Sequence, residues 1–578
     1  MADVTAVVQA IEREYQHRQA AGNEDVIALI AQGQASQAIE NLLFFTPPRA
    51  FQACLDRILF EIEARSKRLD EDLAAKALVF LIDLTLGLNS FLPRWNLQHT
   101  ERHGPFAITE ADVAQAAKKS GELAVDLGAR APAAASRLLS TLQAETAARL
   151  RAEKAQDPET EAKTIVGGSL KTYLTRSKAD IAHSHLRRIA EMRNAGLTPT
   201  ELGNDYAQFL KYAMYVGISF VTTNPVLIDI AWRNKRARWD AALDAIVAEH
   251  PSANANERVR LLTIEIVLDS MRYLRPLFLL TRGQTGYVCL QVNPREHDDA
   301  GAMIAYASST YETMRHRLDG GVPNVVFKLP ATKAGLEACA ALVQRGIGVT
   351  ITVCFGLFQH LPFARVIASA IGEGRALVSY LVEMNGRLAY PVRDELLAKA
   401  DVLADLDIDE AQIREAAAWA GVAVIKKLHR LLGKQGFDPA RIRPLVASLR
   451  IYQGQAYRTL PGAFPDITET LGTGTISVFP DVRNAFDGEP ECELQPRQVE
   501  QAVPAQVLDV LAHSELFRQA YYVADRHWVS DEDARFCPAH PLTLQDEARV
   551  LAWAPVRHTL GQFIESYDAL IERVQERM

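Results

Sequence analysis

The sequence lacks several features that would each indicate a particular class of protein. Its 578 residues include only six cysteines, and no two of them form a C-x-x-C pair, which argues against a zinc site and against a disulfide framework. The net charge is −8 and no long basic run is present, so nothing indicates binding to nucleic acid or to an anionic membrane surface. The sequence therefore predicts a cytoplasmic protein in a reducing compartment, with no metal site.

Long apolar runs are also scarce. The first residues, "MADVTAVVQAIEREYQHR", mix acids with bases and lack the order of a signal peptide. The most apolar helical stretch, "ALVFLIDLTLGL", contains Asp83 and is shorter than the ~20 apolar residues that cross a bilayer. We therefore expect this stretch to be a buried helix, and we expect neither export nor a membrane span.

The composition, with 48% hydrophobic and 23% charged residues, is typical of a globular protein of roughly two to four domains. As far as about residue 195, apolar residues recur at helical spacing, as in "EDVIALIAQGQASQAIENLLFF". No strand is predicted in this part. A proline, a glycine pair and several charges predict a linker or loop over residues 153–168.

From about residue 218, short β-branched segments alternate with helical stretches. The seven segments are "SFVTTNP", "GYVCLQVNP", "NVVFKLP", "GVTITVCF", "ALVSYLV", "PLVASLR" and "TISVFP", a pattern that indicates parallel βα units. A closed (β/α)8 TIM barrel needs one more strand, which we expect from "LTPTELGN". The predicted organisation is an all-α region over 1–195, a barrel over 196–480 and a C-terminal helical segment over 481–578 that packs on the barrel.

One lysine interrupts an apolar strand. In "NVVFKLPAT", Lys328 lies near the C-terminal end of its strand, where the reactive sites of such barrels are found. Burial there disfavours the charged amine and lowers its pKa, which makes a lysine nucleophilic toward a carbonyl. From this segment alone we favour the simpler alternative, in which the stem of the lysine packs while its head reaches water.

Polar residues on neighbouring strands strengthen the interpretation of Lys328 as a reactive residue. Thr350, Thr352 and Cys354 share one parity on the fifth strand, as do Cys289 and Gln291 on the third. Two hydroxyls and an amide that face the barrel interior could bind a sugar hydroxyl or position a water. The alternative is that the threonines are core residues whose hydrogen bonds are satisfied.

The seventh strand ends in "ASLR", which places Ser448 and Arg450 on one parity. A guanidinium there suits a phosphate or carboxylate, because it offers forked donors to paired oxygens, and the alternative is a salt bridge to a loop acid. Asn224 precedes a proline in "FVTTNP", which is common turn chemistry. His360 follows the fifth strand and is expected to be a helix-face histidine.

Together, these segments resemble a known family. "VTTNPVLI", "VVFKLPATKAGLEACAALVQRGIGVTITVCFGLFQH" and "VASLR", in this order, resemble the transaldolase family of Schiff-base barrels, including its fructose-6-phosphate aldolase branch. The resemblance runs from about 200 to 480, and "GQFIESYDALIERV" is similar to the family's C-terminal helix. The first 195 residues lie outside it.

The resemblance implies roles for individual residues. The Schiff-base lysine of the family falls on Lys328, and the threonine that helps to hold the catalytic water falls on Thr352. Asn224 corresponds to an asparagine that contacts a substrate hydroxyl. Ser448 and Arg450 correspond to the phosphate-binding serine and arginine of the seventh strand.

Other positions depart from the family pattern. Ser379 and Arg387 are counterparts of a serine and a second phosphate arginine, with extra residues between them in "SYLVEMNGR". Gln291 replaces the glutamate of most transaldolases, as it does in the aldolase branch, and a glutamine cannot shuttle a proton as a carboxylate does. Thr350 replaces an asparagine of the fifth strand.

The aspartate that serves the family as acid/base for carbon–carbon cleavage is the most serious departure. Counting back along the first strand places Leu202 at its position, whereas Asp205 matches a neighbouring aspartate. Either the alignment shifts by about one turn and Asp205 is the base, or the base is absent.

The resemblance implies an enzyme of carbohydrate metabolism, of the pentose phosphate type, that transfers a dihydroxyacetone unit between phosphorylated sugars through a lysine Schiff base. An aldolase-like lyase is the first alternative, and a non-catalytic barrel that still binds a sugar phosphate is the second. No cofactor is expected, because the iminium of the lysine serves as its own electron sink.

Overall fold

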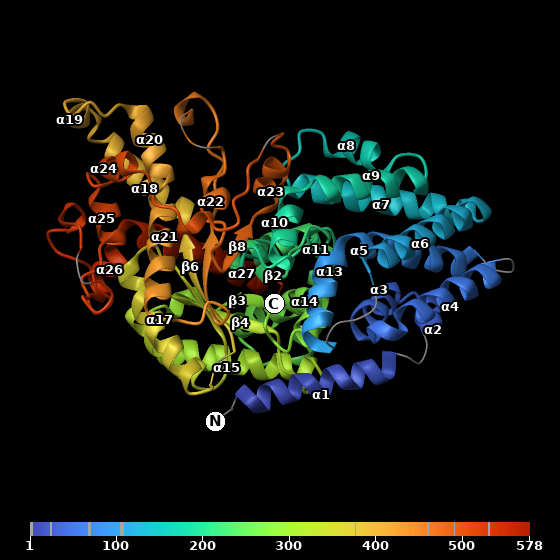
Figure 1. Cartoon of the computed structure of the whole chain (residues 1–578). Helices are drawn as coiled ribbons and strands as arrows, with labels where there is room; N and C mark the ends of the chain where they lie inside the picture. Colours follow the sequence, from blue (N-terminus) through green and yellow to red (C-terminus); the bar gives the residue numbers. More distant parts are fainter. Residues whose placement is uncertain are drawn as a thin grey trace.

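The computed structural model describes residues 4–22, 26–66, 71–103, 109–375, 377–458, 460, 462–490, 492–529 and 532–577. Its centre is a closed barrel of parallel strands, in which β1 to β8 follow one another in sequence order and β1 pairs with β8. Helices connect the strands, and an all-helical region precedes the first of them (Figure 1). The predicted (β/α)8 TIM barrel with an all-α N-terminal region is thereby confirmed.

The strands lie where the β-branched segments predicted them, and the "LTPTELGN" segment supplies β1 as the barrel required. Their bounds are β1 Glu201–Asn204, β2 Phe220–Thr222, β3 Val288–Gln291, β4 Val325–Pro330, β5 Val349–Thr352, β6 Ser379–Met384, β7 Ile442–Ala447 and β8 Thr475–Val478. Residues that are partners across neighbouring strands point to the same side of the sheet, so the register identifies the side chains that face the interior.

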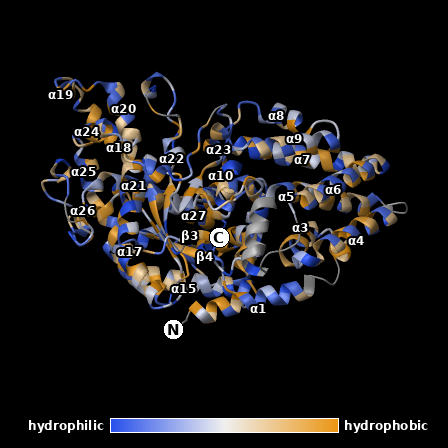
Figure 2. Ribbon diagram, in the orientation of Figure 1, coloured by the Kyte–Doolittle hydropathy of each residue, from blue (hydrophilic) through white to orange (hydrophobic). Residues whose placement is uncertain are grey.

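The N-terminal region is a stack of helices on one side of the barrel (Figure 1). The helices are α1 Val4–Gly22, α2 Val26–Ala31, α3 Ala35–Glu40, η1 Asn41–Phe45, α4 Pro48–Ser66, α5 Glu71–His103, α6 Glu110–Arg130, α7 Pro132–Ala152, α8 Pro158–Val166, α9 Leu170–His183 and α10 His185–Asn194. In Figure 2 the colours of these helices change between hydrophobic and hydrophilic along their length, as expected of amphipathic helices.

Two expectations for this region have different outcomes. The apolar stretch around Asp83 belongs to α5, whose segment Glu71–Ser90 is apolar and long enough to cross a membrane but is 72% buried inside the molecule, so the predicted buried helix is confirmed. The loop predicted over 153–168 is wrong in its centre, where α8 forms. Asp157 caps this helix by accepting the Thr160 amide, and Pro158 occupies the first turn, where a proline costs no hydrogen bond.

The helices of the barrel follow their strands in sequence. They are α11 Leu210–Tyr215, α12 Pro225–Asn234, α13 Arg236–Glu249, α14 Ala255–Leu280, η2 Pro294–Glu296, α15 Ala300–Arg317, α16 Lys333–Val343, α17 Leu357–Gly372, α18 Asn385–Leu397, α19 Ala400–Ala404, α20 Glu410–Ala418, α21 Ala420–Lys434, η3 Gln455–Tyr457, α22 Pro465–Thr468 and α23 Pro480–Asp487. The C-terminal segment adds η4 Gln498–Glu500, α24 Ala505–Leu511, α25 Glu515–Tyr521, η5 Ala534–Phe536, α26 Glu547–Ala552 and α27 Ala554–Gln575.

A buried ion pair lies at the N-terminal end of the barrel, away from the strand ends that carry reactive sites. Arg443 of β7 donates to Glu201 of β1 at 2.7 Å, and Ser219 donates to the same carboxylate at 2.9 Å. Burial alone would raise the pKa of Glu201, but the charges of Arg443 and Arg193 together with hydrogen bonds lower it. The carboxylate is therefore ionised inside the barrel. Its pairing with Arg443 explains why a glutamate can occupy a buried position of β1, a segment whose composition is poor for a strand.

The N-terminal region is joined to the barrel by a second buried ion pair. Arg275 of α14 is only 1% exposed, and its Nε donates to the Glu14 carboxylate of α1 at 2.7 Å. The same guanidinium donates to the Val322 carbonyl at 3.0 Å. Because an unpaired buried guanidinium is costly, α1 is held against the barrel by more than apolar contact.

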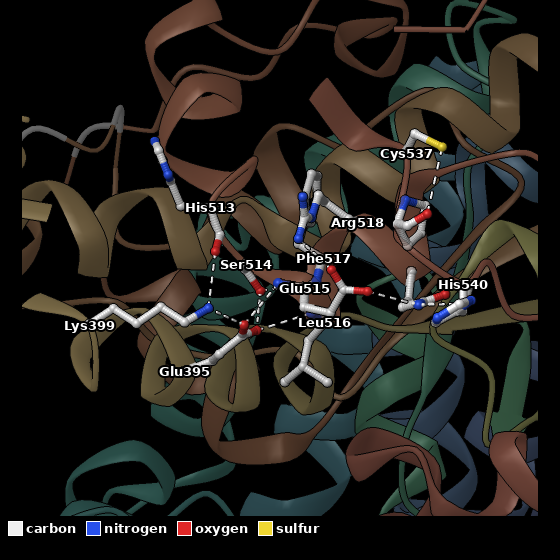
Figure 3. Close-up of polar contacts among 12 residues, drawn as sticks. Glu395, Lys399, His513, Ser514, Glu515, Leu516, Phe517, Arg518, Cys537 and His540 are labelled. Carbon is white, nitrogen blue, oxygen red and sulfur yellow. Dashed lines mark hydrogen bonds and ion pairs between the residues drawn. The ribbon is translucent and has the colours of Figure 1, made fainter. Parts of the chain in front are cut away.

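One carboxylate of the barrel anchors the C-terminal segment (Figure 3). Glu395 of α18 accepts hydrogen bonds from the Ser514 hydroxyl at 2.6 Å and from the backbone amides of Glu515 and Leu516 at 2.8 and 3.0 Å. Lys399 donates to it at 2.6 Å. Burial alone would raise the pKa of Glu395, but these bonds lower it overall. The barrel therefore supplies the anion at the start of α25.

Replacing Glu395 with alanine is expected to lower the free energy of unfolding by about 2 kcal/mol, because it removes charge-assisted hydrogen bonds and leaves backbone amides unsatisfied. The lowered pKa means that this stabilisation is complete above the ordinary value of 4.5 and is lost as the pH falls through the folded-state pKa. Urea titrations at pH 7 and pH 4 measure both effects. Glu337→Ala, at an exposed position of α16, is the control, and an equal loss in both variants contradicts the anchoring role.

Candidate active site

Lys328 lies inside the barrel at the C-terminal half of β4. Its residue is 4% exposed, and its Cα partners are Gln291 on β3 and Thr350 on β5. The three side chains therefore share one row of the barrel interior. Lys328 forms no ion pair with any described residue. The strand thus presents a buried amine that no carboxylate neutralises.

Several polar atoms around this row have no hydrogen-bond partner among the described residues. They include the Gln291 Oε1 and Thr350 Oγ1 atoms, both buried. A buried polar group without a partner is costly, and such groups are concentrated at functional sites. Cys289 shares the inward parity of Gln291 on β3, and burial raises the pKa of its thiol against the opposing effects of the Lys328 charge and the Thr350 hydroxyl. These groups are available to a polar ligand.

The end of β5 differs from the predicted alternation. Thr352 follows the inward parity and its hydroxyl lies 3.8 Å from the Met384 sulfur of β6. The strand ends there, and Val353 adopts a left-handed conformation with φ of 53°. Cys354 is therefore turned away, and its sulfur lies 3.4 Å from Nδ1 of His360 on α17. The prediction that Cys354 shares the parity of the two threonines is wrong.

His360 lies on helix α17, as predicted, and its side chain is fully buried. Its Nε2 lies 2.8 Å from the Glu383 carboxyl of β6, and both side chains are 0% exposed. Burial lowers the pKa of His360 to about 3 and raises that of Glu383. The second oxygen of Glu383 has no partner among the described residues, which favours the neutral acid. The pair is a neutral bridge between β6 and α17, outside the barrel interior.

Asp205 is the acid of the first strand that reaches the site. It follows β1 with the inward parity of Gly203, and the Thr222 hydroxyl of β2 donates to its carboxylate. Its charge also acts on Cys289 and on Arg387, so it lies at the C-terminal mouth of the barrel. Leu202 has the opposite parity and packs toward Gly217 before β2. Of the two alternatives for the aspartate, the geometry favours Asp205.

Two arginines approach each other beside this mouth. Arg387 lies on α18, and Arg450 follows β7. Burial and the charge of Arg450 lower the pKa of Arg387 to about 10, and neither guanidinium forms an ion pair with a described residue. Arg387 donates to Gln562 at 2.6 Å, while its buried Nε has no partner among the described residues. Two guanidinium groups without an ion pair to a described residue are thus available to an anion.

The loop after β7 fixes the position of Arg450. Its backbone amide donates to Asp466 at 2.8 Å, and its guanidinium donates to the Ser448 carbonyl at 3.0 Å. Ser448 is left-handed, with φ of 61°. A Cβ on Gly386 would approach the Arg450 Cγ and the Ser448 oxygen to 2.5 Å, so glycine is required at this crossing. Burial raises the pKa of Asp466 to about 6. The hydrogen bonds from Asn385 and Arg450 act in the opposite direction but do not cancel this rise.

The C-terminal helix α27 completes the mouth. The ring of Phe563, which is fully buried, lies 6.0 Å from the Lys328 amine and 5.5 Å from the Arg387 guanidinium, measured to its centroid. Sequence reasoning gave no site role to Phe563 or Asp466, since neither belongs to a motif. The amphipathic pattern of the last helix was the only available signal. The Phe563 ring therefore lies near both the Lys328 amine and the Arg387 guanidinium, at about the same distance from each.

Two residues predicted for the site, Asn224 and Ser379, form hydrogen bonds to backbone amides near the ends of strands. Asn224 caps α12, where its Oδ1 accepts the Leu227 amide at 3.0 Å; this is the expected turn chemistry, and it places the residue at the C-terminal end of β2. Ser379 is the first residue of β6, and its hydroxyl accepts the Val349 amide at 3.3 Å. The next residue, Tyr380, is the partner of Thr350, so Ser379 has the opposite parity and points away from the barrel interior. The structure does not bring Ser379 into the site.

The fold and site together define a (β/α)8 barrel with a buried amine and an arginine pair at the C-terminal strand ends. The family model described as "Transaldolase/Fructose-6-phosphate aldolase" matches residues 204–442. A relative named "Transaldolase 1" of Streptomyces avermitilis is 32% identical over 289 residues, which cover 48% of this chain and 70% of the relative. A "Transaldolase" of Mycobacterium leprae is 25% identical over 362 residues, or 62% of this chain and 86% of the relative.

The similarity also extends to a "Transaldolase" of Thiobacillus denitrificans, which is 27% identical over 276 residues. The chain belongs to the transaldolase family, with an additional helical region before the barrel.

Proposed function

We propose that the protein makes or breaks a carbon–carbon bond in a ketose phosphate through a Schiff base on Lys328. Membership of the transaldolase family supports a transferase or lyase of this type. The observation that carries the proposal is the buried, unpaired Lys328 in one row with Gln291 and Thr350, beside two unneutralised arginines. A sugar with a carbonyl near one end and a phosphate at the other matches both features.

The proposed reaction begins when the Lys328 amine adds to the ketose carbonyl and water leaves. The resulting iminium withdraws electrons from the neighbouring carbons. Asp205 takes the proton of the fourth-carbon hydroxyl, the bond between the third and fourth carbons breaks, and its electron pair moves into the iminium to give an enamine. An aldose leaves, and attack of the enamine on a second aldose reverses the steps. The Thr222 hydroxyl donates to Asp205 and so orients its carboxylate.

Dihydroxyacetone transfer between sugars is the reaction that we propose first. In a lyase, water would instead release the three-carbon unit, and Gln291 is the feature that favours this second reading. Its amide cannot exchange a proton, so water activation would depend on other groups such as Thr352. Product analysis with and without an acceptor aldose separates the two: products that appear only with the acceptor identify the transferase.

The test of the proposal is covalent trapping. Incubation of the full chain with fructose 6-phosphate and sodium borohydride is expected to reduce the imine and fix the sugar on one lysine. Peptide mass spectrometry is expected to find the adduct on Lys328. Absence of an adduct with any ketose phosphate, together with retained binding of that sugar, would leave the barrel as a sugar-phosphate-binding descendant and refute the enzyme.

The arginine pair is expected to recognise phosphate. Arg450→Ala should raise KM for a phosphorylated ketose on the order of 100-fold, since a charge-assisted, forked contact is worth about 2–3 kcal/mol. The same change should alter kcat/KM for the unphosphorylated ketose by less than about threefold. Steady-state kinetics with both sugars measure the difference. Arg458→Ala, further along the same loop, is the matched control, and equal losses for the two sugars contradict the assignment.

A further inference from the structure

A cavity that Lys328 does not line lies between the N-terminal helices and the barrel. Its volume is about 490 Å³, and α7, α8 and α9 face α11, α13 and α14 across it. This volume is about three times that of the ~150 Å³ cavity that binds benzene in a protein core. None of the residues proposed for the sugar site lines it.

The walls of the cavity are strongly aromatic. Tyr173, Tyr212, Tyr215, Trp239 and Tyr273 all line it. Flat rings offer large contact areas to another ring and favour stacked or edge-on geometry. The opening carries Glu145 and Lys235, both exposed and of opposite charge. The cavity is thus accessible from solvent, and its opening selects neither anions nor cations.

The half-buried charges of the walls are already paired within the protein, whereas Glu145, Asp180 and Lys235 are exposed. Lys211 pairs with Asp83 at 2.5 Å. Arg149 pairs with Glu153 at 3.1 Å and lies 3.9 Å from the centroid of the Tyr212 ring. A charged ligand in the aromatic interior would therefore lose its hydration, and the charges without an ion pair to a described residue would lie only at the exposed part of the lining, which is costly. The cavity favours a neutral molecule.

Two hydrogen-bond donors remain in this apolar setting. The indole N–H of Trp239 is buried and has no partner among the described residues, although the residue is only 4% exposed. The hydroxyl of Tyr215, a residue that is 8% exposed, forms no hydrogen bond to a described side chain or carbonyl. Buried donors of this kind normally have an acceptor. We infer that the cavity binds a neutral aromatic molecule that carries a hydrogen-bond acceptor.

The test uses 6-propionyl-2-dimethylaminonaphthalene, a neutral fluorescent ring compound with one ketone oxygen. Titration into the full chain is expected to give a saturable blue shift with one site per chain. Trp239→Phe, which keeps a ring but removes the donor, is expected to raise Kd about threefold to tenfold. Ala148→Phe, which places a ring in the cavity, is expected to abolish the shift, whereas Ala133→Phe, at an exposed position of the same helix, should leave it unchanged.

Circular dichroism establishes that each variant is folded, and Lys328→Ala reports whether the dye has entered the barrel instead. Full binding by Lys328→Ala supports the cavity. The inference is overturned by the absence of saturable binding, by equal affinity of Ala148→Phe and the parent, or by loss of binding in Lys328→Ala. Because no sugar is used, these outcomes are independent of the proposed reaction.

Discussion

Replacing Lys328 with alanine is expected to abolish the borohydride-dependent adduct and to lower turnover by a factor on the order of 10³ or more. The proposed reaction has no other electron sink, and removal of a covalent nucleophile typically costs at least this much. The buried position of Lys328 between Gln291 and Thr350 means that alanine also removes the only described amine in that row.

The control for this experiment is Lys333→Ala, an exposed lysine at the start of the helix that follows the same strand. It should retain both trapping and turnover within about twofold, as is usual for an exposed substitution. Lys328→Arg tests whether charge alone suffices, because a guanidinium stays protonated and forms no imine. Retained turnover in Lys328→Ala or Lys328→Arg would exclude the Schiff base on this residue.

Asp205→Asn is expected to separate imine formation from bond cleavage. The variant should still form a borohydride adduct, since Lys328 is intact, whereas turnover should fall by about 10²–10⁴-fold because general-base catalysis contributes this much. Asparagine can still accept the hydrogen bond from Thr222, so the geometry of the mouth is preserved. Single-turnover trapping and steady-state kinetics on one preparation measure the two steps.

Thr222→Val provides a graded comparison, because it removes only the donor to Asp205 and should lower turnover less than Asp205→Asn does. A larger loss in Thr222→Val, or unchanged turnover in Asp205→Asn, contradicts the role of Asp205 as the base. In the second case the acid/base group would have to be sought elsewhere in the mouth.

Local patterns in the sequence were sufficient to predict the barrel. The β-branched segments predicted seven strands, the count of a closed barrel required the eighth, and β1 Glu201–Asn204 lies where it was expected. Register then follows from parity, which is why Gln291, Lys328 and Thr350 could be grouped before the structure was known. β1 was hard to recognise because its glutamate is stabilised by Arg443, more than 240 positions further along the chain.

Contacts between distant segments were not predictable in the same way. Phe563 reaches Lys328 from the last helix, and Asp466 holds the backbone of Arg450 from a short turn; neither has a local signature. Ser379 was assigned from the family resemblance, and it was misplaced because the pairing of Tyr380 with Thr350 turns Ser379 away from the interior. The left-handed Val353 redirected Cys354, and a β-branched residue gives no warning of such a bend.

The contact between Glu14 and Arg275 has a consequence for shortened versions of the protein. A chain that began at the barrel would lose this carboxylate and uncover the guanidinium, at a cost of up to about 3–5 kcal/mol. That is a large share of the 5–15 kcal/mol that separates typical folded domains from their unfolded chains. We therefore expect removal of the helical extension to destabilise the barrel.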